Sequence, residues 1–176
     1  RYLGKLTARL KDMGIYDETL ILFLSDHGHV IGEHGLVGKN WNTNAYREVV
    51  DLVAMIKFPR SLHAGTRVDA MCYNIDLVPT VCSHVGVPES DSEAWKQFDG
   101  IDLHPLIEGR VAKIRDCVTC SYPSNMMVKS LEHTLLYDRE HVPFKLFDRK
   151  ADPSEERSLV EGRPEEIEVL AQLETA

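Results

Sequence analysis

Residues 20–39 read Leu20-Ile-Leu-Phe-Leu-Ser-Asp-His-Gly-His-Val-Ile-Gly-Glu-His-Gly-Leu-Val-Gly-Lys39, and this stretch decides the fold. Its first five residues are apolar and too few for a helix of ordinary length, which indicates a strand. Because polar residues flank the run, it is typical of a strand buried on both faces of a parallel sheet. Ligands bind beyond the carboxyl ends of strands in open α/β sheets, so Asp26 and His27 are expected where chemistry is done.

A glycine-rich loop follows the predicted strand and contains Gly28, Gly32, Gly35 and Gly38. Glycine has no Cβ and allows tight backbone turns, so this loop can fold back over the strand end. Lys39 closes the loop with a positive charge. The sequence therefore predicts a carboxylate, an imidazole and a lysine at one edge of a sheet.

The flanking sequence favours an α/β domain over residues 1–115. Residues 1–13 carry apolar side chains at helical spacing with Gly14 as a C-cap, which predicts an amphipathic helix. Residues 52–56 predict another sheet strand. Asp76 is expected to cap a helix that runs to His84.

From Asp116 the pattern changes to short β-like runs, which predict a small antiparallel β subdomain over residues 116–176. The runs are Val118–Tyr122, Met126–Ser130, Thr134–Tyr137 and Phe144–Phe147. Residues 164–175 predict a terminal helix that begins with a proline. Cys117 and Cys120 form a lone C-x-x-C without a second pair, so structural or incidental thiols are the better interpretation.

The overall charge limits the kinds of partner. The chain has 20 Lys plus Arg against 28 Asp plus Glu, a net charge of −8. Without a cluster of basic residues, nucleic acid is not an expected partner. No apolar run approaches the ~20 residues of a membrane span, so a membrane is not expected either. An acidic chain that binds an anion must rely on a local cation such as Lys39.

The loop also resembles the metal-binding loop of the sulfatase family, in the alkaline-phosphatase superfamily. The resemblance rests first on Ser25-Asp-His-Gly28, Gly32-Glu-His-Gly35 and Lys39. Three later segments are similar to family motifs in the same order, namely Ile75–Thr80, Phe98–Leu103 and Leu146–Leu159. The resemblance implies the C-terminal portion of an alkaline-phosphatase-like mixed sheet flanked by helices, followed by the antiparallel subdomain.

The resemblance further implies a hydrolase that acts on sulfate esters, either small molecules or saccharides. Asp26 and His27 would be metal ligands, Lys39 would contact the sulfate as a catalytic residue, and His34 would contact the substrate. The metal would be Ca²⁺, although an oxygen-rich site with one nitrogen also suits Mg²⁺ or Mn²⁺. His27 stands where the family more often has Asn.

The family's nucleophile motif, Cys/Ser-x-Pro-x-Arg, does not occur in these residues. The resemblance therefore implies that a formylglycine nucleophile and two further acidic ligands lie in a missing N-terminal half of the catalytic domain. On its own, the chain is expected to have no sulfatase turnover.

Several alternatives stay open from the sequence. Asp26 could be a turn residue with His27 hydrogen-bonded beside it, and Lys39 could be a solvated loop charge. The same scaffold could hydrolyse phosphate or phosphonate monoesters, since a fold does not determine its substrate. An inert fragment or a binding module is the non-enzymatic alternative, and the cellular compartment cannot be read from the sequence.

Overall fold

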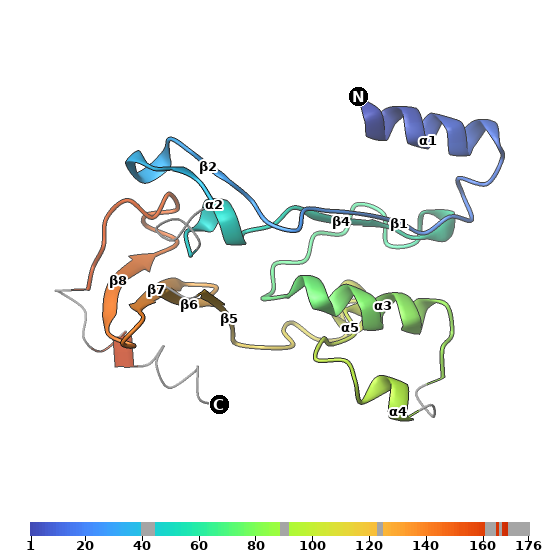
Figure 1. The fold of residues 1–176 in the computed structure, drawn as a ribbon. Helices are drawn as coiled ribbons and strands as arrows, with labels where there is room; N and C mark the ends of the chain where they lie inside the picture. The colour runs from blue at the N-terminus through green and yellow to red at the C-terminus, as the bar shows by residue number, and fades with distance from the viewer. Residues whose placement is uncertain (40–44, 89–91, 123–124, 161–164, 166, 169–176) are drawn as a thin grey trace.

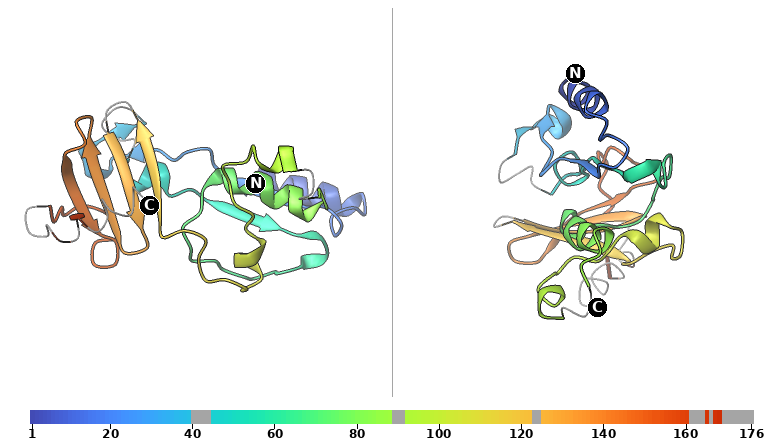
Figure 2. Two further views of the ribbon diagram at one scale, coloured as in Figure 1. Left: turned by 90° about the horizontal axis from the view of Figure 1, so that it is seen from below. Right: turned by 90° about the vertical axis from the view of Figure 1, so that its right-hand side faces the viewer.

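The computed structural model describes the chain except for residues 40–44, 89–91, 123–124, 161–164, 166 and 169–176. Figure 1 shows two regions, a layered α/β region that contains α1, α3 and α5, and a four-stranded sheet at the opposite end. Figure 2 shows the strands of this sheet side by side in its left view and the sheet nearly edge-on in its right view. Among the described helices, none is long and apolar enough to cross a membrane.

The predicted first strand forms β1 (Ile21–Leu24), and the second forms β4 (Ala54–Lys57). The two strands pair with each other in antiparallel register, with Leu22 opposite Ile56. The expectation of a parallel strand buried on both faces is therefore wrong for the described chain, where Leu24 is 43% exposed. The physical reason is that the chain turns back after β1 and returns alongside it, so no crossover connection separates the two strands.

Helices lie on both sides of the β1–β4 pair (Figure 1). On one side lies α1 (Tyr2–Asp12), which confirms the predicted amphipathic helix, and Gly14 follows it with φ +69°. On the other side lie α3 (Leu77–His84), which confirms the second predicted helix, and α5 (His104–Ile107). The side chains of α3 and α5 pack against the strands in one apolar cluster, whose members include Leu22, Ile56, Leu77, Leu103 and Leu106.

Asp76, at the start of α3, holds this region together. Its carboxylate is fully buried and accepts hydrogen bonds from the backbone N–H groups of Tyr73 at 2.7 Å and Ile101 at 2.8 Å. The Arg115 guanidinium donates to both carboxylate oxygens, at 2.6 and 2.9 Å. A buried charge is tolerated because it is paired and fully hydrogen-bonded.

The glycine-rich loop contains a two-stranded hairpin that the sequence did not indicate. It consists of β2 (Val30–Ile31) and β3 (Val37–Gly38), with the 3₁₀ helix η1 (Glu33–Gly35) between them. Gly32 adopts φ +130° and Gly38 φ +104°, which few other residues can do. The shorter elements between β3 and β5 are the helices α2 (Arg47–Val50) and α4 (Ser92–Trp95) and the 3₁₀ turns η2 (Pro59–Ser61) and η3 (Asn74–Asp76).

The predicted antiparallel strands are confirmed, and they form a four-stranded meander in the order β5-β6-β7-β8. Its strands are β5 (Cys117–Tyr122), β6 (Asn125–Ser130), β7 (His133–Asp138) and β8 (Pro143–Asp148). One face packs on Tyr46 and the other on Leu159 and its neighbours. The predicted terminal helix lies almost entirely outside the described residues.

Candidate functional site

Asp26 and His27 follow β1 directly, and their side chains lie together beyond its carboxyl end. The His27 backbone N–H donates to Asp26 Oδ1 at 2.8 Å, and His27 Nε2 lies 3.8 Å from Asp26 Oδ2. The Asp26 side chain is 88% exposed and that of His27 39% exposed. An oxygen and a nitrogen donor are therefore close together and accessible.

The orientation of the His27 ring depends on the next residue. Nδ1 of His27 lies 2.8 Å from the Gly28 carbonyl oxygen. A carbonyl oxygen only accepts hydrogen bonds, so Nδ1 must carry the proton and Nε2 of the neutral ring is a free acceptor. Backbone carbonyls orient metal-binding histidines in this way.

The surroundings of Asp26 favour its negative form. The His27 backbone N–H makes the largest contribution to lowering the pKa of Asp26, and the charge of the His27 ring in its protonated form contributes next. The positive charge of Lys39 acts in the same direction. Lys39 also opposes the burial that raises the pKa of the Cys120 thiol. The charge of Lys39 therefore acts on both Asp26 and Cys120 of β5.

We call residues 25–28 the strand-end turn, and its backbone is held by the segment that leads from α2 into β4. The Gly28 N–H donates to the Val49 carbonyl at 2.8 Å, and the Ser25 N–H donates to the Val53 carbonyl at 3.2 Å. A Cβ at Gly28 would stand 1.8 Å from the Glu48 carbonyl oxygen. Gly28 is therefore required for this close approach rather than for a positive φ.

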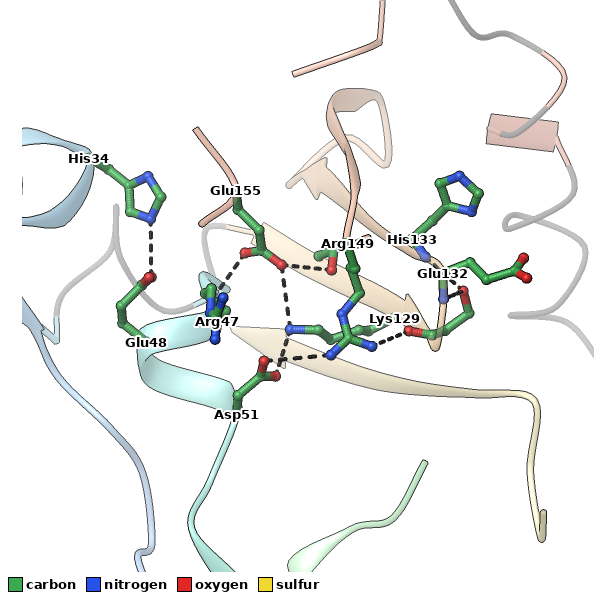
Figure 3. Close-up of polar contacts among 11 residues, drawn as sticks. His34, Arg47, Glu48, Asp51, Lys129, Glu132, His133, Arg149 and Glu155 are labelled. Atoms are coloured by element: carbon green, nitrogen blue, oxygen red, sulfur yellow. Dashed lines mark hydrogen bonds and ion pairs between the residues drawn. The ribbon is translucent and has the colours of Figure 1, made fainter. Parts of the chain in front are cut away.

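His34, a predicted substrate contact, is placed elsewhere by the structure. Its Nε2 lies 3.0 Å from Glu48 Oε2, and its ring stacks on Tyr46 with the centroids 4.0 Å apart (Figure 3). The imidazole is 7% exposed and does not line the cavity that contains Asp26. In this geometry His34 links the hairpin loop to Glu48 of α2 and to Tyr46, and its contact with a substrate stays a prediction.

The other predicted site residues share one cavity of about 940 Å³. Asp26, His27 and Lys39 line it together with residues of β5 and β6, which include Cys120 and Lys129. The cavity thus lies between the strand-end turn and the C-terminal sheet. A sheet that the sequence suggested to be an appendage forms part of its wall.

One carboxylate and one imidazole fit part of the coordination shell of Ca²⁺, Mg²⁺ or Mn²⁺. In the described part of the chain, no group of three or more His, Cys, Asp or Glu side chains could hold a metal ion. Asp26 and His27 would therefore need further ligands to form a complete site.

The sequence did not indicate that Asp51 and Lys129 pair with each other next to the segment that binds the turn. The only signal was that each places a charge inside an apolar run. Their contact joins residues 78 positions apart, which no local pattern can show.

Comparison with known proteins relates this chain to a protein family. The family model described as sulfatase matches residues 1–87. An N-acetylglucosamine-6-O-sulfatase from Bacteroides thetaiotaomicron is 28% identical over 166 residues, a match that covers 87% of this chain and 28% of the relative.

Two solved structures share the fold along 98% of this chain, each with a TM-score of 0.77. One is BT4656 in complex with its substrate D-glucosamine-2-N,6-O-disulfate, at 24% identity and 36% coverage of that protein. The other is a phosphonate monoester hydrolase of Agrobacterium radiobacter, at 23% identity and 37% coverage. The chain therefore spans about a third of the length of these proteins. By the match of residues 1–87 to the family model and by its sulfatase relatives, the chain belongs to the sulfatase family.

Proposed function

We propose that the protein to which this chain belongs hydrolyses sulfate esters, and that Asp26 and His27 form half of its divalent-metal site. One observation carries the proposal. The Asp26 carboxylate, the free Nε2 of His27 and the charge of Lys39 meet at a single cavity beyond β1. Relatives of the chain carry this activity in their names, among them the N-acetylglucosamine-6-O-sulfatase from Bacteroides thetaiotaomicron.

Each of the three residues has a distinct task in the proposal. Asp26 offers an anionic oxygen, and the hydrogen bond from the His27 backbone N–H is the main cause that lowers its pKa. His27 offers Nε2 because Gly28 engages Nδ1. Lys39 neutralises the charge that develops on the sulfate oxygens as the ester bond breaks. A bound cation, for which we propose Ca²⁺ with Mn²⁺ or Mg²⁺ as alternatives, would polarise the ester oxygens.

The nucleophile is proposed to come from outside residues 1–176, as a formylglycine in an N-terminal half of the catalytic domain. Ser25 is the nearest hydroxyl in the strand-end turn, but it donates to the His27 carbonyl at 2.6 Å. We propose a sulfated saccharide as the substrate, by analogy with the named substrate of BT4656.

A second candidate is the hydrolysis of phosphonate or phosphate monoesters. It is favoured by the phosphonate monoester hydrolase, which matches the fold with the same TM-score as BT4656. Both reactions place negative charge beside Lys39, so the site geometry alone does not separate them. Turnover measured in parallel with an aryl sulfate and an aryl phosphonate distinguishes the two reactions.

Replacement of Lys39 by alanine tests the proposed function. In the full-length protein, Lys39→Ala should lower kcat for an aryl sulfate by about 10²–10³-fold, the usual cost of losing one group that stabilises developing negative charge. Lys113→Ala is the matched control, because Lys113 is 65% exposed and pairs with Asp116 away from the cavity. The control should keep wild-type turnover.

Unchanged turnover in Lys39→Ala would show that Lys39 is a solvated loop charge and does not contact the sulfate. If the wild-type protein turned over the phosphonate faster than the sulfate, the second candidate would replace the first. Calcium titration of Asp26→Asn, with no substrate present, tests the metal half of the proposal independently.

A further inference from the structure

Lys129 lies in β6 of the C-terminal sheet and is a charged side chain that is only 2% exposed. Its ammonium group contacts Asp51 Oδ1 at 2.6 Å and Glu155 Oε1 at 3.4 Å (Figure 3). Burial of an ammonium group is costly unless it is paired. Lys129 is therefore held at one place between two carboxylates.

The carboxylates that contact Lys129 are themselves fixed. Glu155 accepts a hydrogen bond from the Thr134 hydroxyl at 2.8 Å and another from the Arg47 backbone N–H at 3.1 Å. Arg149 lies 3.7 Å from Asp51 Oδ2. Two cations and two carboxylates thus balance in a network between the sheet and the ends of α2 (Figure 3).

Asp51 connects this network to the strand-end turn. It lies between Val49 and Val53, whose carbonyls accept the N–H groups of Gly28 and Ser25. The backbone that Lys129 anchors through Asp51 is therefore the backbone against which Asp26 and His27 are held. The close approach of Gly28 to the Glu48 carbonyl means that a displacement of this backbone would be transmitted to the turn.

We propose that Lys129 is a positioning residue, which acts through Asp51 to hold the strand-end turn in the geometry that lets Asp26 and His27 share one cation. The proposal rests on the function proposed above. Without the ammonium group, Asp51 and Glu155 would face each other with only the more distant Arg149 to offset their charges. Asp51 is 33% exposed and would turn toward water, which would release the segment that accepts the Gly28 and Ser25 hydrogen bonds.

Hydrogen exchange in the full-length protein tests the proposal without requiring activity. Lys129→Met should speed exchange at the Gly28 and Ser25 amides by about tenfold relative to the Ile101 amide, because only the turn is opened locally. Ile101 is a suitable reference because its N–H is bonded to the separate Asp76 cluster. Lys129→Arg keeps the charge and should restore most of the protection.

Arg115→Met is the matched control, since it also breaks a buried ion pair but on Asp76. It should give the opposite selectivity, with faster exchange at Ile101 than at Gly28. A second readout is the Ca²⁺ affinity of the turn, which should fall by about 10–100-fold in Lys129→Met, the usual range when a group that orients a ligand is lost. Asp51→Asn should have a similar effect, and the double variant should not add to it.

Equal acceleration at Gly28 and Ile101 in Lys129→Met would show a merely structural role and overturn the proposal. If Lys129→Met does not fold, Asp51→Asn and Lys129→Arg decide the question at the same amides. A wild-type protein that turns over no sulfate ester would refute the proposed function, while the exchange and Ca²⁺ measurements would still decide whether Lys129 positions the turn.

Discussion

The C-terminal sheet and the β1–β4 pair are both antiparallel, but they differ sharply in burial. In the sheet, Leu135 and Leu146 are fully buried, and each strand pairs with the next one in the sequence. In the β1–β4 pair, Phe23 is 41% and Met55 53% exposed. The region that carries the proposed ligands is thus the one with less apolar surface buried.

This difference in burial means that one region contributes most of the folding free energy and the other carries the proposed ligands. Buried apolar area is the main source of folding free energy, so the sheet should dominate the stability of the described chain. The strand-end turn instead depends on hydrogen bonds to the α2–β4 segment and on the Lys129–Asp51 pair. The more deeply buried region therefore supports the one that carries the proposed ligands.

The largest expected effect comes from replacing one leucine in each region by alanine. Leu135→Ala should lower the free energy of unfolding by about 2–5 kcal/mol, because it leaves a cavity in a close-packed core. Leu24→Ala should cost about 1 kcal/mol or less, because Leu24 is 43% exposed. Urea unfolding of both variants in the same protein measures the difference. If both variants lost the same free energy of unfolding, Leu24 would have to be buried in the full-length protein. The difference in burial between the two regions would then not hold.

A smaller effect is expected when a methyl group is added where the turn contacts α2. Gly28→Ala should cost about 1–3 kcal/mol as the backbone shifts to relieve overpacking, because the new Cβ would stand 1.8 Å from the Glu48 carbonyl. It should also weaken Ca²⁺ binding, since Asp26 and His27 move with Gly28.

The control for this variant is Gly4→Ala in α1, where nothing lies within 4 Å of the new methyl group. It should stabilise the helix by up to about 1 kcal/mol, since alanine is the better helix former. Unaltered Ca²⁺ affinity in Gly28→Ala would show that the turn does not depend on its contact with α2.

The smallest expected effect is an acid sensitivity located beside α3 and α5. His84 stacks parallel to His104 with the ring centroids 5.8 Å apart, and His104 Nδ1 lies 2.7 Å from Asp102 Oδ1. Burial lowers the pKa of His84, and the neighbouring His104 lowers it further. For Asp102, burial acts to raise the pKa, but hydrogen bonds from His104 and Ser83 outweigh it and leave the pKa below 3.8.

Both shifts predict a loss of stability as the pH falls, in different windows. Below the ordinary His value of 6.5 the unfolded chain binds the proton at His84 more readily than the folded chain, so stability declines from there. The contribution of Asp102 is complete above 3.8 and is lost only as the pH falls through its lower folded value. His84→Gln should remove the first decline. Thermal unfolding between pH 7 and pH 5 measures it, and an unchanged slope would refute the assignment.

The sequence alone determined the elements whose signals are local. The four C-terminal strands were predicted almost to their observed ends, because period-2 runs and turn residues set both the strands and their sequential pairing. The helices α1 and α3 were predicted because helical spacing and a terminal glycine act within a few residues. Asp76 stands at the N-cap position of α3 as expected, but its side chain makes no cap hydrogen bond and binds Tyr73, Ile101 and Arg115 instead. The proximity of Asp26 to His27 also follows from adjacency at a strand end.

Only the tertiary structure decided how these elements meet. The antiparallel partner of β1, the pairing of His34 with Glu48 and the burial of Lys129 against Asp51 all depend on contacts between distant residues. A charged residue inside an apolar run gives the same sequence pattern whether its side chain is solvated or paired. The difference depends on another segment, which supplies the partner. The sequence could therefore name the proposed ligands, but the support beneath them is a property of the folded chain.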